Sequence, residues 1–85
     1  MFRIFLDIPV QKFLKKLDYS ISQRIIEVVE MLAEDPIPHD SKRIIGIKEK
    51  VFRIRVGKFR VLYRVNYENF SIVIIDIDTR EHVYK

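Results

Sequence analysis

The stretch VFRIRVGKFRVLYRV, from Val51 to Val65, decides the fold of this 85-residue chain. In its first half, apolar side chains alternate with charged ones: Phe52, Ile54 and Val56 against Arg53 and Arg55. Alternation with a period of two is typical of a strand with one buried face and one open face. Gly57 and Lys58 then fit a two-residue turn, and the alternation resumes at Phe59. The stretch therefore predicts a β-hairpin with cations on its open face.

The chain continues this hairpin into a three-stranded antiparallel meander. The second strand is predicted over Phe59–Tyr67, a turn at Glu68 and Asn69 follows, and the third strand runs over Phe70–Asp78. The middle of the third strand is apolar on both faces, which is typical of a central strand. Strict alternation divides its apolar side chains into two sets, Ile72 and Ile74 on one face and Val73, Ile75 and Ile77 on the other. The same alternation places Asp76, Asp78 and Arg80 together on one face.

Before the hairpin, the sequence predicts a short strand and a first amphipathic helix. The segment FRIFLD, from Phe2 to Asp7, is β-prone, and either Asp7 or Pro9 then opens the helix. Apolar residues recur at helical spacing after Pro9: Val10, Phe13, Leu14 and Leu17. One face of this helix is therefore expected to pack against the sheet.

A second helix restarts the apolar pattern. It is capped by Asp18 or by Ser20, and Ser20 would form a capping box with Gln23 three residues later. Its apolar stripe consists of Ile25, Val28, Val29 and Leu32. The prolines in DPIPHDSK, residues 35–42, end the helix. The following RIIGIKEK, residues 43–50, fits either a short strand or a loop.

These elements predict a single α+β domain over residues 1–85, in the order β-α-α-β-β-β. Two helices formed early in the chain must pack on one face of a small, mostly antiparallel sheet, because each element needs to bury its apolar side. The opposite face of the sheet then stays open. Arg53 and Arg55 lie on this open face, and at least one arginine of the next strand, Arg60 or Arg64, is expected beside them.

Composition excludes several classes of protein. The chain has no cysteine, so neither a disulfide framework nor a thiolate metal site is possible, and His39 and His82 are too far apart in sequence to form a local ligand pair. We predict no metal and no cofactor. No apolar run approaches the roughly 20 residues needed to span a membrane, and the first residues lack the pattern of a signal peptide. We expect a cytoplasmic protein.

The distribution of charge predicts an anionic partner. Lys and Arg number 16 against 12 acidic residues, which gives a formal charge of +4. Nine cations fall between residues 42 and 64, where Glu49 is the single acid: Lys42, Arg43, Lys48, Lys50, Arg53, Arg55, Lys58, Arg60 and Arg64. Such a cluster suits RNA or another polyanion. A solvated surface or a simple binding patch is the plainer interpretation of the same arginines.

The end of the chain, TREHVY, adds polar side chains to this basic face. Guanidinium groups bind phosphate well because they present a planar fork of donors and stay charged. In RNA, the 2′-hydroxyl can attack its own phosphodiester if a proton acceptor, a proton donor and cations are present. Tyr84 is a possible base if nearby arginines favour its phenolate, and His82 has the more convenient ordinary pKa. Spacing alone does not choose between them.

Three segments together resemble the RelE/ParE superfamily of toxins from toxin–antitoxin modules, and its RelE branch most closely: LAEDPIP, RIIGIKEKVFRIRVGKFRVLYRV and IIDIDTREHVY. The resemblance covers nearly the whole chain. It implies the RelE fold and a metal-independent endoribonuclease that cleaves mRNA in the ribosomal A site. It also implies that Arg60 holds the scissile phosphate, that Arg80 stabilises the transition state, and that Tyr84 acts as general base or stacks on the substrate base. Residues expected to bind RNA are Arg53, Arg55, Lys48, Lys50, Lys58 and His82.

The same resemblance implies partners and alternatives. The partners are the ribosome, mRNA and a cognate RelB-like antitoxin, expected to contribute an acidic, amphipathic helix that binds the basic face. No membrane partner is expected. One alternative is a ParE-like protein that inhibits DNA gyrase by binding alone. Another is a catalytically inactive member that only binds its antitoxin.

Overall fold

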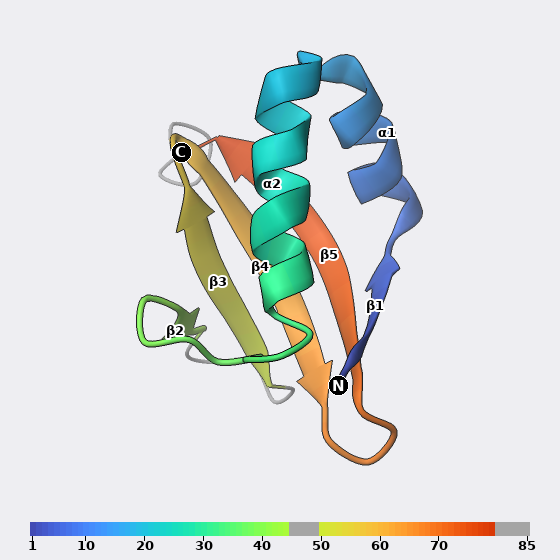
Figure 1. Cartoon of the computed structure of the whole chain (residues 1–85), viewed down its shortest axis with the longest axis vertical. Helices are drawn as coiled ribbons and strands as arrows, with labels where there is room; N and C mark the ends of the chain where they lie inside the picture. The colour runs from blue at the N-terminus through green and yellow to red at the C-terminus, as the bar shows by residue number, and fades with distance from the viewer. Residues whose placement is uncertain (45–49, 80–85) are drawn as a thin grey trace.

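The computed structural model describes residues 1–44 and 50–79, which form a five-stranded sheet with two helices on one face (Figure 1). The elements are β1 (Arg3–Leu6), α1 (Ile8–Lys16), α2 (Tyr19–Met31), β2 (Lys42–Arg43), β3 (Val51–Val56), β4 (Phe59–Asn66) and β5 (Ser71–Thr79). The strand order is β1-β5-β4-β3-β2, with β1 parallel to β5 and the other pairs antiparallel. The predicted α+β class and the meander are confirmed. The two-residue strand β2 joins the last residue of the predicted connection, Lys42, to the first residue of the ambiguous segment, Arg43, and residues 45–49 lie outside the described part.

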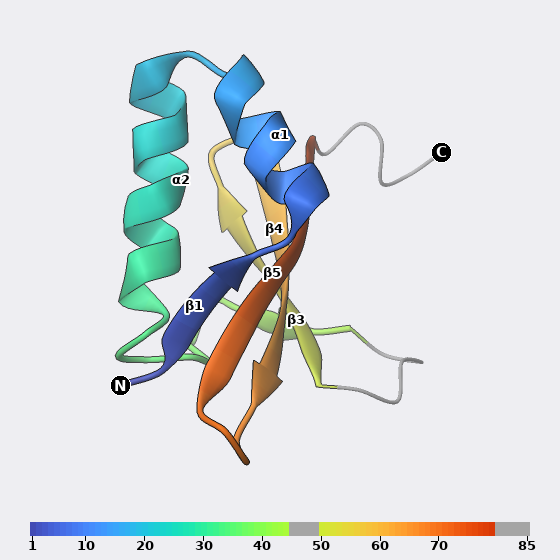
Figure 2. The same cartoon turned by 90° about the vertical axis from the view of Figure 1, so that its right-hand side faces the viewer.

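Both helices lie on the same side of the sheet (Figure 2). The predicted apolar stripe of α2 is confirmed, since Ile25, Val29 and Leu32 are buried and pack with the alternate residues of β3. Within β3, Phe52, Ile54 and Val56 are buried, whereas Arg55 is exposed and Arg53 half-buried. The period-two pattern of the hairpin therefore sets which face meets the helices. Neither helix in the described ranges is long and apolar enough to cross a membrane.

The two helices begin in different ways. Asp7 caps α1, because its side chain accepts a hydrogen bond from the backbone amide of Ile8 at 3.1 Å, and a proline follows in the first turn. The predicted capping box of α2 is wrong. The carbonyl oxygen of Asp18 already accepts hydrogen bonds from the amides of Ile21 and Ser22, so the helix starts at Tyr19. Ser20 therefore lies inside the first turn, where its side chain cannot serve as the cap.

A β-bulge changes the faces of β5. Tyr63 of β4 pairs with Ile74, but the next pair is Leu62 with Asp76, so Ile75 is an extra residue. The prediction that Ile77 lies on the face opposite Ile72 and Ile74 is therefore wrong. Ile77 is buried with Ile72 and Ile74 in the core beneath the helices. The carboxylate residues that follow the bulge, Asp76 and Asp78, move to the open face beside the arginines of β4.

The predicted ends of β4 and β5 need small corrections. The second strand ends at Asn66, one residue earlier than predicted, and β5 runs from Ser71 to Thr79. Phe70 is excluded from β5 because its φ of 54° places it in the left-handed region, which interrupts an extended strand. Gly57 has a φ of 61° in the turn between β3 and β4, a conformation that favours glycine.

Tyr63 is the largest fully buried side chain of the described core and carries a polar group inside it. Its hydroxyl donates a hydrogen bond to the carbonyl oxygen of Pro36 at 2.8 Å, and its ring stacks on Phe52 at a centroid distance of 5.9 Å. The hydrogen bond ties the segment after α2 to the middle of the sheet. Burial raises the pKa of the Tyr63 hydroxyl above its ordinary value.

This raised pKa predicts a loss of stability at alkaline pH. The unfolded chain loses the Tyr63 proton near its ordinary pKa of about 10, whereas the folded chain keeps it, so the free energy of unfolding falls as the pH rises above about 10. Tyr63→Phe should remove this contribution and should cost about 1–2 kcal/mol near neutral pH, because the Pro36 carbonyl loses its donor. Urea unfolding of both proteins from about pH 8 to about pH 11 measures the difference. Parallel pH profiles would contradict the prediction.

Candidate nucleic-acid interface

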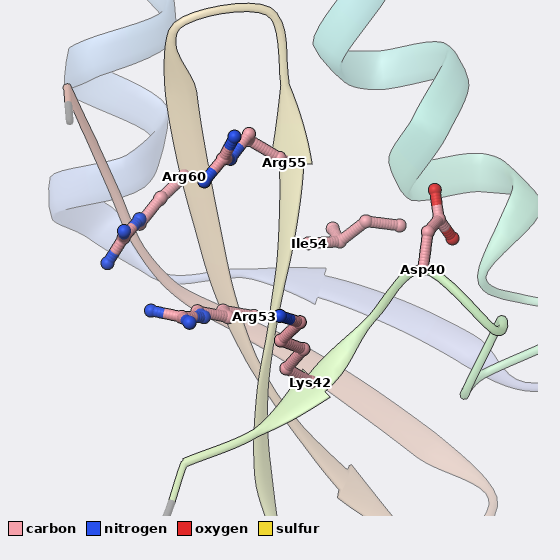
Figure 3. A pocket seen from close by; sticks show the side chains of 6 residues that line it. All are labelled: Asp40, Lys42, Arg53, Ile54, Arg55 and Arg60. Atoms are coloured by element: carbon pink, nitrogen blue, oxygen red, sulfur yellow. The ribbon is translucent and has the colours of Figure 1, made fainter.

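A basic hollow of about 320 Å³ lies along β3, and its arginines lie on the open face of the sheet (Figure 3). Among the described residues, six line this basic hollow: Asp40, Lys42, Arg53, Ile54, Arg55 and Arg60. β3 and β4 supply the three arginines, β2 supplies Lys42, and Asp40 comes from the segment just before β2. Four cations and one carboxylate therefore surround one opening.

The sheet register places like charges directly opposite one another in the basic hollow. Arg55 of β3 pairs with Arg60 of β4, and Lys42 of β2 pairs with Arg53 of β3. Directly opposed like charges destabilise an antiparallel pair of strands. An anion that binds between them would offset this repulsion. The register therefore favours the binding of an anion at this position.

Arg60 is unusual among these cations because it is only 3% exposed. On its other side, Asp78 of β5 is its direct cross-strand neighbour, placed there by the bulge. The Asp78 side chain also accepts a hydrogen bond from the amide of Thr79 at 2.8 Å. In the described ranges, no buried side-chain nitrogen or oxygen lacks a hydrogen-bond partner. A buried and satisfied guanidinium is held in place before a ligand arrives, which is the condition for electrostatic preorganisation.

The structure brings some of the predicted site residues together and separates others. Arg53, Arg55 and Arg60 share the basic hollow. Lys58 lies in the β3–β4 turn, where its ammonium is 5.7 Å from the centre of the Phe59 ring, and Lys50 lies near the opposite end of β3. Four predicted residues fall outside the described part of the chain: Lys48, Arg80, His82 and Tyr84. Their roles stay predictions.

Three residues that line the basic hollow or lie beside its arginines were not predicted as site residues. Lys42 was counted in the basic stretch, but only the two-residue strand β2 positions it opposite Arg53. Asp40 lines the basic hollow from the connection after α2, and no local sequence pattern predicts this position. Asp78 reaches Arg60 only because of the bulge. The two prolines of DPIPHDSK were the one available signal that this connection is constrained.

The chemistry of the basic hollow favours a phosphate group. Three guanidinium groups present planar sets of N–H donors, which match the oxygens of a phosphodiester. Within residues 1–44 and 50–79, no three histidine, aspartate or glutamate side chains come together as a metal site. The arrangement can therefore bind a phosphodiester and stabilise negative charge that develops on it.

Sequence comparisons connect this fold and site to known proteins. A family model described as the ParE toxin of the type II toxin–antitoxin system parDE matches residues 4–84. Putative toxin RelE1 of Methanocaldococcus jannaschii is 42% identical over 79 residues, which cover 89% of this chain and 87% of that protein. Both matches therefore extend over the helices, the basic hollow and nearly all of the remaining chain.

Solved structures give the same result in three dimensions. The archaeal RelE–RelB complex from Pyrococcus horikoshii OT3 matches with a TM-score of 0.84 and 28% identity, covering 93% of this chain and 94% of that one. The toxin–antitoxin complex RelBE2 from Mycobacterium tuberculosis matches with a TM-score of 0.80 and 25% identity, covering 93% and 98%. The similarity thus includes the order of the strands and the helices that cover them.

Proposed function

This chain belongs to the RelE/ParE superfamily of toxins from toxin–antitoxin systems, and we propose that it is an endoribonuclease that cleaves mRNA in the ribosomal A site. One observation carries the proposal beyond family membership. The basic hollow opposes Arg55 to Arg60 and Lys42 to Arg53, an arrangement that a bound anion would stabilise. A phosphodiester of RNA can supply this anion and places a reactive bond among the cations.

The proposed reaction uses the RNA's own nucleophile. A base removes the proton of the 2′-hydroxyl, the 2′-oxygen attacks the adjacent phosphorus, and the bond from phosphorus to the 5′-oxygen breaks. The 5′-oxygen takes up a proton, so the products are a 2′,3′-cyclic phosphate and a 5′-hydroxyl. Arg60 holds the phosphate and offsets the charge that develops on its oxygens, with Arg53 and Arg55 beside it. Arg80 is assigned to the same charge, and Tyr84 or His82 to the proton.

We also propose a RelB-like antitoxin as the physiological partner. The similar solved structures from Pyrococcus horikoshii OT3 and Methanococcus jannaschii are complexes of RelE with RelB. The open face of this chain offers cations beside exposed or half-buried apolar side chains such as Phe5 and Val73. An acidic, amphipathic helix complements such a face. Co-expression with the adjacent reading frame, followed by size-exclusion chromatography, should recover a complex, and separate elution of the two chains would contradict it.

Primer extension on mRNA translated in a purified system tests the proposed activity. We expect cuts inside A-site codons with the wild-type chain, no cuts without ribosomes, and strongly reduced cuts with Arg80→Ala. Intact message in every reaction would contradict the nuclease. The match to the ParE family model makes inhibition of DNA gyrase the second candidate. A supercoiling assay then decides whether the basic hollow serves binding alone.

A further inference from the structure

Three aromatic rings gather at the end of the sheet where β4 turns into β5. The ring of Phe2 contacts Tyr67 edge-on at a centroid distance of 5.5 Å and Phe70 at 5.6 Å. We call Phe2, Tyr67 and Phe70 the aromatic end. Tyr67 is 42% exposed and Phe70 is 56% exposed, so the rings do not merely close the core. The aromatic end presents ring surface to solvent.

The backbone holds this turn in a fixed shape. The side-chain oxygen of Asn66 accepts hydrogen bonds from the amides of Glu68 at 2.8 Å and Asn69 at 3.3 Å, and the Ser71 hydroxyl donates to the Asn69 side chain at 2.6 Å. Phe70 keeps a φ of 54°, a costly conformation for a bulky residue. Exposing a large ring on strained backbone has no benefit for the core. Strain of this kind is retained where it positions a group for binding.

Two cations, Lys50 and Arg64, lie beside the aromatic end. The ammonium of Lys50 lies 5.2 Å from the centre of the Tyr67 ring. A shallow hollow of about 510 Å³ beside it is lined by Lys50, Arg64, Val65, Asn66, Tyr67 and Glu68. The shallow hollow has two cations and one carboxylate, so its charge favours an anionic ligand over a basic one. An aromatic ring next to cations is the combination that binds an unpaired nucleobase and its phosphate.

The aromatic end is a different place from the basic hollow. Tyr67 lies seven positions after Arg60 along β4 and its turn, which at about 3.3 Å per residue is about 23 Å. The two sites lie toward opposite ends of the sheet, since the β4–β5 turn is beside the N-terminus in Figure 1 and the β3–β4 turn is at the other end. Stacked bases rise about 3.4 Å each, so a single codon does not reach from one site to the other.

We propose that the aromatic end binds an unpaired base of ribosomal RNA, with Tyr67 and Phe70 as the stacking surface and Lys50 at the adjacent phosphate. This inference rests on the proposed function, because it supplies a ribosome contact for a nuclease that acts in the A site. It assigns affinity for the ribosome to one end of the sheet and cleavage to the other. Binding and chemistry should therefore be separable by mutation.

The test compares the double variant Tyr67→Leu/Phe70→Leu with Tyr19→Leu. Leucine keeps an apolar side chain but has no aromatic face, and Tyr19 is 78% exposed on α2, away from the aromatic end. Dissociation constants for purified ribosomes are measured by fluorescence anisotropy of labelled toxin. The double variant should bind about 5- to 100-fold more weakly, whereas Tyr19→Leu should bind like the wild type. The single-turnover cleavage rate of the double variant at saturating ribosomes should equal that of the wild type.

A second variant avoids any effect on the packing of the rings. Lys50→Gln should weaken ribosome binding and reduce the slope of log affinity against log salt by about 0.7, the value for one lost phosphate contact on single-stranded RNA. Lys12→Gln, an exposed lysine of α1, is the matched control and should leave the slope unchanged. Ultraviolet cross-linking followed by mass spectrometry should also join ribosomal RNA to the peptide that contains Tyr67.

The outcomes separate this inference from the proposed function. Unchanged ribosome affinity in the double variant, with normal cleavage by the wild type, overturns the proposal that the aromatic end binds ribosomal RNA. The proposed nuclease activity would then still hold. Loss of antitoxin binding with normal ribosome binding also overturns it, because the surface would then contact a protein. A wild-type chain that neither binds ribosomes nor cuts mRNA overturns both proposals.

Discussion

Arg60→Ala is expected to lower the single-turnover rate of mRNA cleavage by about 100- to 1,000-fold at saturating toxin, the usual effect of removing one preorganised donor from a developing oxyanion. The reason is the position of Arg60. It is buried, it faces Arg55 on one side and Asp78 on the other, and it lines the basic hollow. Arg60→Lys should restore only part of the rate, because an ammonium keeps the charge but not the planar fork.

Arg43→Ala provides the matched control for this prediction. Arg43 is an exposed arginine of the same sheet, but its cross-strand partner is the buried Phe52, so its side chain lies on the other face from the basic hollow. Cleavage by this variant should stay close to that of the wild type. Circular dichroism and antitoxin binding confirm that each variant is folded. Equal losses in the two alanine variants, or full activity of Arg60→Ala, would remove Arg60 from the reaction.

Much of the basic hollow could be predicted from the sequence because a hairpin with a short turn fixes its own register. Once Gly57 and Lys58 form the turn, Val56 must pair with Phe59 and Arg55 with Arg60. The alternation in VFRIRV then places its arginines on the face of the sheet that points away from the helices. Local patterns of this kind depend on neighbouring residues only, which is why three of the predicted site residues do meet in the structure.

The remaining features depend on contacts between distant segments, which local patterns do not record. Lys42 joins the basic hollow through a strand of only two residues, too short to give a periodic signal. The burial of Arg60 also cannot be predicted from alternation, which indicates an exposed side chain at that position. The roles of Arg80 and Tyr84 are implied by resemblance to a family and that of His82 by the chemistry of imidazole, and all three stay predictions.

The bulge in β5 had the largest effect on the predicted faces. Strict alternation puts Ile75 and Ile77 together on the open face and puts Asp76 and Asp78 beneath the helices. Two buried carboxylates without partners would be costly. One extra residue resolves this conflict, since it returns Ile77 to the core and moves both carboxylates to the arginine side of the sheet. The same irregularity thus improves the core and supplies Asp78 to Arg60.

The bulge predicts that Ile77→Ala lowers the free energy of unfolding much more than Ile75→Ala does. Ile77 is 4% exposed within the core, so Ile77→Ala should reduce the free energy of unfolding by about 2–5 kcal/mol. Ile75, the extra residue, is only partly buried, and Ile75→Ala should cost about 1 kcal/mol or less. Since small domains are typically stable by about 5–15 kcal/mol in total, the first substitution should bring the chain close to unfolding.

Urea unfolding of the two alanine variants at the same pH measures this difference directly, because both remove the same atoms from the same strand. A larger loss for Ile75→Ala would mean that β5 alternates without interruption. Asp78 would then point away from Arg60, and the face would lose the carboxylate that lies opposite its buried arginine. The stability of one core residue therefore tests the geometry on which the proposed role of Arg60 depends.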